Sequence, residues 1–114
     1  MMVLPFPPSV NHYWRSVGQK VLISAKGRQY REAVAKLAIE NNFPKFGISR
    51  VSVHIEAWMP DKRRRDLDNL LKSLLDSLTH AGVWDDDSQV DGIAIWRSPH
   101  IGGMCKVEVR SCGA

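Results

Sequence analysis

Six leucines between positions 67 and 78 recur with the period of an α-helix. They follow one another at spacings of three and four residues: Leu67, Leu70, Leu71, Leu74, Leu75 and Leu78. This spacing places all six on one apolar stripe, which must be buried against another element. Gly82 is well placed to end the helix in the left-handed conformation. We therefore predict a buried helix over residues 66–80.

Alternation of apolar and polar side chains indicates strands elsewhere in the chain. It is strictest over residues 51–59, where Val51, Val53 and Ile55 share one face and Pro60 ends the run. We predict strands over residues 2–6, 21–24, 51–59, 90–97 and 105–110. The last two strands are expected to pair as a terminal hairpin, because a turn rich in glycine and proline joins them.

The segment between the first two strands is polar and aromatic. It follows Pro7-Pro8, which ends a strand because proline supplies no N–H for the ladder. We predict a loop over residues 10–20 that displays its side chains. A second helix is predicted from Ser24, which acts as its cap, to Asn41-Asn42 ahead of Pro44.

Length and composition favour one small domain. A chain of 114 residues with 44% apolar side chains supports one modest core. We predict a single α+β domain over residues 1–114, with a mixed β-sheet packed against two main helices. A core of this size gains from a partner surface, which is compatible with a homo-oligomer, although size alone does not decide this.

Charge and targeting features narrow the class of partner. The net charge of +4 mildly favours a polyanion such as nucleic acid. Cys105 and Cys112 lack the spacing of a zinc site or a disulfide framework, so we expect two reduced thiols. The first residues do not resemble a signal peptide, and no apolar window could span a bilayer. We expect a cytoplasmic protein without a membrane partner.

The leucine-rich helix starts among dense opposite charges. Three arginines, Arg63 to Arg65, run directly into Asp66 and Asp68. Exposed N–H groups and the positive end of the helix dipole stabilise carboxylates there, so Asp66 could simply be the helix cap. Lys72 stands one turn after Asp68 and could form an ordinary ion pair with it. These structural interpretations remain open beside a functional one.

A second acidic cluster, Asp85-Asp86-Asp87, follows the helix. Three adjacent carboxylates repel one another, and a structural role does not explain them. Whether they meet Asp66 and Asp68 depends on the fold. If they meet, a hard cation must join them, and Mg²⁺ fits because it takes carboxylate ligands and leaves positions for phosphate oxygens.

Such a metal site suits phosphodiester hydrolysis. Arg63, Arg64 and Arg65 would then neutralise the DNA backbone, and Lys72 would stabilise the charged transition state. In the early loop we expect Asn11, Tyr13 and Arg15 to contact DNA, although an aromatic side chain beside a proline turn also suits packing. The four histidines are scattered without ligand spacing.

These segments resemble the RusA-type Holliday junction resolvases. The resemblance extends over PFPPSVNHYWR, ISAKGRQYRE and MPDKRRRDLDNLLKSLLDSLTHAGVWDDDSQV, with a looser match at the C-terminal end. The central segment is the most specific part. The resemblance implies a dimeric, Mg²⁺-dependent endodeoxyribonuclease from bacteria or their phages and prophages, for which Mn²⁺ is a substitute and no small-molecule cofactor is expected.

The resemblance also implies roles for individual residues. The matching positions are catalytic carboxylates and metal ligands (Asp66, Asp68 and Asp87), a catalytic lysine (Lys72), an auxiliary acid (Asp86) and residues that position the helix or its ligands (Asn69 and Asp76). Asp85 has no matching role. The expected substrate is four-way junction DNA, which is two-fold symmetric and suits a two-fold dimer that makes paired nicks in recombination and repair.

Two other functions remain open from the sequence. One is a DNA-binding module without catalysis, although carboxylates facing phosphate would not help such a protein. The other is a nuclease with the same chemistry that acts on flaps or forks, which the sequence does not distinguish from a junction resolvase.

Overall fold

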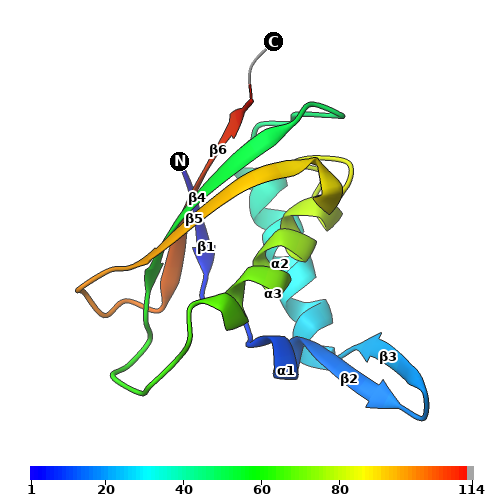
Figure 1. Cartoon of the computed structure of the whole chain (residues 1–114), viewed down its shortest axis with the longest axis vertical. Helices are drawn as coiled ribbons and strands as arrows, with labels where there is room; N and C mark the ends of the chain where they lie inside the picture. Colours follow the sequence, from blue (N-terminus) through cyan, green and yellow to red (C-terminus); the bar gives the residue numbers. More distant parts are fainter. Residues whose placement is uncertain (113–114) are drawn as a thin grey trace.

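The computed structural model describes residues 1–112 and contains one four-stranded mixed sheet with helices on one side (Figure 1). The strands are β1 (Met2–Pro5), β4 (Val51–Trp58), β5 (Val90–Arg97) and β6 (Met104–Ser111), in the spatial order β1-β6-β4-β5. The predicted α+β class with a mixed sheet is confirmed.

The central strand β4 pairs with β5 in parallel and with β6 in antiparallel orientation. Ile55 is aligned with Ile95 on one side and with Val107 on the other. The predicted terminal hairpin is therefore wrong, because β4 lies between its two strands. Their connection crosses the end of β4, where Ser98 N–H donates to the carbonyl of Ala57 at 2.9 Å.

The two main helices supply the other layer of the core. Helix α2 (Ala25–Glu40) begins at Ser24, whose hydroxyl accepts the Gly27 N–H at 3.0 Å as a predicted cap. Helix α3 (Asp68–His80) follows β4 and buries Leu70, Leu74 and Leu78 in the same core as the inner face of β4. Gly82 ends α3 with a φ of 83°. Within residues 1–112, no helix has the length and apolar character needed to cross a membrane.

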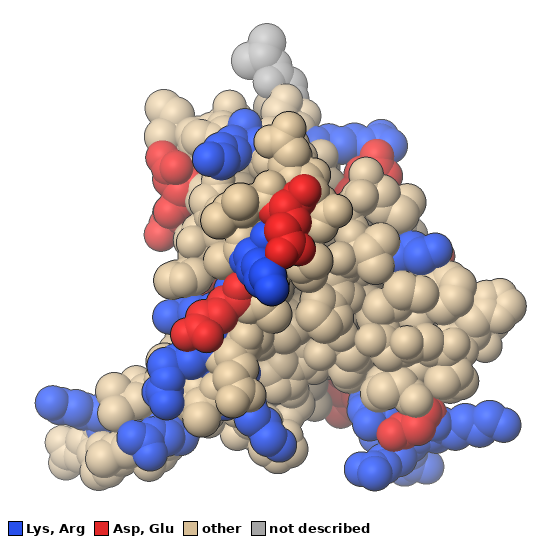
Figure 2. Space-filling model, turned by 180° about the vertical axis from the view of Figure 1, so that it is seen from behind, with Lys and Arg blue, Asp and Glu red and all other residues tan. Residues whose placement is uncertain are grey.

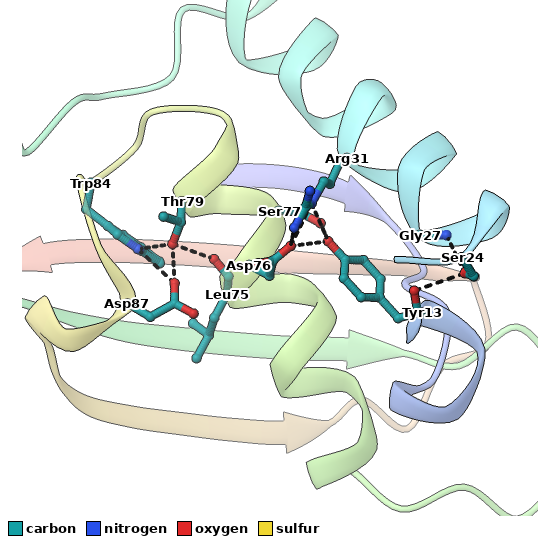
Figure 3. Close-up of polar contacts among 10 residues, drawn as sticks. All are labelled: Tyr13, Ser24, Gly27, Arg31, Leu75, Asp76, Ser77, Thr79, Trp84 and Asp87. Carbon is teal, nitrogen blue, oxygen red and sulfur yellow. Dashed lines mark hydrogen bonds and ion pairs between the residues drawn. The ribbon is translucent and has the colours of Figure 1, made fainter. Parts of the chain in front are cut away.

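The prediction that residues 10–20 form a loop is wrong for most of this segment. It forms a one-turn helix, α1 (Val10–Tyr13), and a separate hairpin of β2 (Trp14–Val17) and β3 (Lys20–Ile23). The helix forms because Tyr13 is fully buried and takes its place in the core. Its hydroxyl donates to Asp76 on α3, and Arg31 on α2 donates to the same carboxylate at 2.7 Å (Figure 3).

The cysteines are both free, as expected. Cys105 is buried on β6, and burial raises the pKa of its thiol to about 12. Cys112 is exposed.

Candidate functional site

The first acidic pair lies at the start of α3. Asp66 and Asp68 are both exposed, and neither forms an ion pair with any residue of the described part of the chain. The N-cap position is occupied by Leu67, and no side chain caps the helix. The interpretation of Asp66 as a simple cap is therefore wrong, and both carboxylates are free to accept a cation at the positive end of the helix.

The three arginines before α3, Arg63 to Arg65, differ in their exposure and contacts. The side chain of Arg65 is 25% exposed, bonds to Asp61 and lies over the Phe6 ring, with 5.7 Å between the guanidinium carbon and the ring centroid. The Arg63 side chain is 81% exposed, although its Nε lies 3.6 Å from Asp61 Oδ2, and Arg64 is exposed as well. Hydrogen bonds from the Arg65 side chain and from the Arg63 N–H lower the pKa of Asp61 to about 2. The Asp61–Arg65 pair thus fixes the loop, while its neighbours face solvent.

A cavity of about 580 Å³ opens beside these charges. The segment from Phe6 to Ser9 and His12 line one wall, and the run from Arg63 to Asp66 with Asn69 lines the other. The cavity therefore joins cationic side chains with one of the free carboxylates. Such a surface can hold a phosphate group next to an acid that would otherwise repel it.

The second acidic cluster lies beyond the other end of α3. Asp87 starts a 3₁₀ turn, η1 (Asp87–Gln89), and its Oδ1 accepts a hydrogen bond from Thr79 Oγ1 in the last turn of α3. The buried Trp84 donates its indole N–H to the same Thr79 oxygen at 2.6 Å (Figure 3). Asp87 is thus oriented through one oxygen, and its other oxygen remains available.

Gln89 fixes the backbone of this acidic turn. Its side-chain amide donates to the carbonyls of Gly47 and Ser49 at 2.7 and 2.8 Å, and its Oε1 accepts the N–H groups of Asp85 and Asp86. Hydrogen bonds from the side chain and N–H of Ser88 lower the pKa of Asp86.

Sequence reasoning did not identify the supporting role of Thr79, Trp84 or Gln89. Gln89 and Trp84 belong to the W-x-D-D-x-Q-V motif, so the motif contains a signal for two of the three. Thr79 stands outside it and offers no such signal.

The two acidic clusters do not meet within one chain. Because β4 and β5 are parallel, α3 runs back along them, with Asp68 at its first turn and Asp87 beyond its last. A helix of 13 residues is about 20 Å long. Across residues 1–112, no group of three or more histidines, cysteines or acids is arranged to hold a metal ion. Within residues 1–112, the topology therefore keeps the two acidic clusters apart.

The remaining predicted residues divide between surface and interior. Lys72 is exposed on α3, and no ion pair in the described part of the chain includes it. Asp76 instead pairs with Arg31, at 2.7 Å between Oδ2 and Nη2. Tyr13 is buried against that pair, so the expectation that it is displayed for DNA is wrong. Asn11 and Arg15 are exposed, as expected.

Known proteins are similar in sequence to this chain over nearly its whole length. The family described as Endodeoxyribonuclease RusA matches residues 5–110. A crossover junction endodeoxyribonuclease of Enterobacteria phage HK97 is 48% identical over 101 residues, covering 89% of this chain and 84% of the phage protein. The crossover junction endodeoxyribonuclease RusA of Escherichia coli strain K12 is 41% identical over 114 residues, covering 98% and 94%. The chain therefore belongs to the RusA family of endodeoxyribonucleases.

Proposed function

We propose that this protein resolves four-way DNA junctions by Mg²⁺-dependent hydrolysis of phosphodiester bonds. The activity after which its relatives are named supports the reaction class. The observation that carries the proposal for this chain is the pair of exposed carboxylates, Asp66 and Asp68, beside the exposed Arg63 and Arg64. This arrangement brings a metal-binding donor set next to groups that attract the DNA backbone.

The donor set fits Mg²⁺, with Mn²⁺ as a substitute. Asp61, Asp76 and Asp91 each have an arginine partner, whereas Asp66 and Asp68 have none within residues 1–112. Hard carboxylate oxygens without a cation partner are the ligands that Mg²⁺ prefers. When bound, the metal supplies activation of water and neutralisation of the attacked phosphate. We assign Asp66, Asp68 and Asp87 as ligands, with Asp86 in an auxiliary role.

Because α3 separates these ligands, we propose that each site is completed by a second copy of the chain. If two α3 helices pack antiparallel about a two-fold axis, the first turn of each lies beside the last turn of the other. Asp66 and Asp68 of one copy then face Asp87 of its partner. The separation of about 20 Å along one helix becomes the separation between two equivalent sites.

An incompletely covered apolar strip supports this dimer. Leu71 and Leu75 on α3 are only partly buried. On the edge strand β5, Ile93 is exposed and Ile95 is partly buried, and both point to the helix side of the sheet, in register with the inner face of β4. Large apolar side chains left uncovered in this way are commonly covered by a partner.

The other polar residues have separate tasks in the proposal. Lys72, exposed one turn after Asp68, stabilises charge that develops on the attacked phosphate. Arg63, Arg64, Asn11 and Arg15 contact the backbone, which selects shape rather than base sequence. Asn69 lines the cavity and orients the start of α3. The two-fold symmetry of the dimer matches that of a four-way junction and allows paired nicks. We place this activity in the cytoplasm, where bacterial and phage DNA is recombined.

A cleavage assay tests the proposal. An end-labelled mobile four-way junction, a flap, a fork and a linear duplex are incubated with the protein in Mg²⁺ or EDTA. Symmetric, metal-dependent nicks in the junction are expected. Nicks in the flap or fork alone would assign a different substrate to the same chemistry, and junction binding without cleavage would leave a binding module.

Substitutions test which residues are required for cleavage. Asp68→Asn is expected to abolish cleavage while junction binding is retained or becomes tighter, because the substitution removes a ligand and a repulsive charge together. Asp85→Asn is the matched control, since Asp85 is exposed and carries no ligand role. Loss of the folded state in Asp68→Asn would instead indicate a structural role for this residue.

A further inference from the structure

The β2–β3 hairpin projects from the body of the molecule at the end where α1 and the first turn of α3 lie (Figure 1). Its strands pair only with each other, from Trp14 opposite Ile23 to Val17 opposite Lys20. The two-residue turn places Gly18 first with a φ of +61°, as a tight hairpin of the II′ kind requires. The hairpin is therefore a well-formed ribbon with both faces open.

Three large apolar side chains of this ribbon are uncovered. Val17, Val21 and Leu22 are 47%, 65% and 40% exposed. At its base the ribbon is anchored, because Trp14 packs edge-on against the buried Tyr13 ring at 5.0 Å between centroids. A two-stranded ribbon with a firm base and an apolar tip gains stability when another surface covers the tip.

The charge of the ribbon indicates what kind of ligand surface covers its tip. The chain has no acidic residue from Met1 to Arg31, while Arg15 and Lys20 are exposed on the ribbon and Lys26 and Arg28 follow at its base. In Figure 2, blue side chains gather at the lower left, where the ribbon projects in that view. A ligand that combines negative charge with flat apolar surfaces fits this tip, and DNA with accessible bases has both properties.

The position of the ribbon relates it to the proposed site. His12 lies in α1, two residues before β2, the first strand of the ribbon. It lines the same cavity as Arg63 and Asp66. The ribbon and the first acidic pair therefore belong to the same end of the molecule. DNA held by this end can contact both.

We infer that the β2–β3 ribbon inserts its outer end at the branch point of junction DNA. Val17 and Val21, which the strand register places on opposite faces of the ribbon, then lie against the unstacked bases on either side, with Arg15 and Lys20 on the flanking phosphates. In a continuous duplex, base faces are stacked and inserting a wedge costs a few kcal/mol per step. At a branch point stacking is already interrupted, so the same insertion costs less. The inference rests on the proposed function and adds a source of junction selectivity.

The test uses the full-length protein carrying Asp68→Asn, so that binding is measured without cleavage. The junction carries 2-aminopurine beside the branch point, and its fluorescence rises when the base unstacks. Val17→Thr with Val21→Thr keeps the β-branched shape of both strands while making the tip polar. Ile39→Thr with Ile48→Thr is the matched control, because both isoleucines are 84% exposed away from the ribbon.

We expect the valine variant to lose the fluorescence rise and to bind the junction about tenfold more weakly, with linear-duplex affinity nearly unchanged. The isoleucine variant should behave like the parent. Circular dichroism checks that each variant is folded, and Val21→Thr alone replaces the double variant if that one unfolds.

Three outcomes would overturn the inference. The first two are an unchanged fluorescence rise, or an equal loss of junction and duplex affinity, in the valine variant. The third is conversion of that variant from dimer to monomer in analytical ultracentrifugation, which would show that the tip covers a second copy of the chain. A protein that binds and unstacks the junction but never cuts it, when Asp68 is intact, would refute the proposed function and leave the ribbon inference standing.

Discussion

The indole N–H of Trp84 donates to Thr79 Oγ1 at 2.6 Å, and the Thr79 oxygen also contacts Asp87 (Figure 3). A carboxylate on a short connecting turn is thereby held by the rigid last turn of α3. Thr79 Oγ1 also lies 2.9 Å from the carbonyl of Leu75, which fixes its own rotamer. The orientation of Asp87 thus depends on a buried aromatic residue that does not belong to the acidic cluster itself.

Thr79→Val should weaken metal use without unfolding the protein, because it keeps the shape of the side chain and removes its hydrogen bonds to Trp84 and Asp87. Loss of such a supporting contact typically costs about 10–100-fold in metal affinity or activity. We expect the Mg²⁺ concentration for half-maximal cleavage to rise accordingly, and Thr79→Ser to restore it. The ¹H–¹⁵N indole signal of Trp84, assigned with Trp84→Phe, should shift in Thr79→Val. An unshifted signal would contradict the hydrogen bond.

Mixing two inactive variants tests whether the sites are shared between copies. Asp68→Asn and Asp87→Asn should each be inactive alone. In a mixed dimer with shared sites, one site carries both substitutions and the other carries neither. Random exchange of equal amounts should therefore restore about a quarter of the wild-type sites, measured as single nicks in the junction.

The control for this experiment mixes Asp66→Asn with Asp68→Asn. Both substitutions lie at the same end of α3, so no mixed dimer can contain an intact site. If the first mixture also stays inactive although subunit exchange is demonstrated, the acids must be brought together in some other way.

Local patterns predicted most elements, whereas pairing and burial required the structure. The period of the leucines located α3, and the alternation around Val53 located β4. The pattern around Ile95 is the same for a strand paired in parallel or antiparallel, so it suggested a hairpin that does not exist. Tyr13 stands among polar neighbours, and nothing local shows that its partner is Asp76, 63 residues away.

The candidate site was also predictable only in part. The residue types and spacing around Asp68 predicted acids at a helix start and left open a cap at Asp66 and an ion pair between Asp68 and Lys72. The structure places the acids there, with neither the cap nor the ion pair among the described residues. The distance to Asp87 was not predictable, because it depends on the direction of α3 relative to two parallel strands. That direction places the two acidic clusters at opposite ends of α3. The proposed site that contains both clusters therefore requires two copies of the chain.

The hydroxyl of Tyr13 should remain protonated at unusually high pH. Burial raises the pKa of Tyr13, its hydrogen bond to Asp76 raises it further, and burial raises the pKa of Tyr30. These are the only two tyrosines, so tyrosinate absorbance at pH 10, the ordinary midpoint, should be lower in the native protein than in the unfolded protein.

The sign of the accompanying stability change follows from the raised pKa. Protons bind more tightly in the folded state, so the stabilisation is complete below pH 10 and is lost as pH rises through the folded-state value. Tyr13→Phe should lower the free energy of unfolding by about 1–2 kcal/mol at neutral pH and make its alkaline decline shallower. Chemical denaturation at several pH values measures both effects. A decline as steep as in the parent protein would assign it to other groups.

The arginine run should show two different responses to substitution in DNA binding. Arg64 is exposed, so Arg64→Gln should remove one phosphate contact and reduce the slope of log affinity against log salt by about 0.9. Arg65 is held by Asp61 and lies over Phe6, so Arg65→Gln should leave that slope nearly unchanged. It should instead lower the thermal stability, because Asp61 loses the partner that depresses its pKa. Equal slopes for the two variants would show that Arg65 leaves Asp61 to bind DNA.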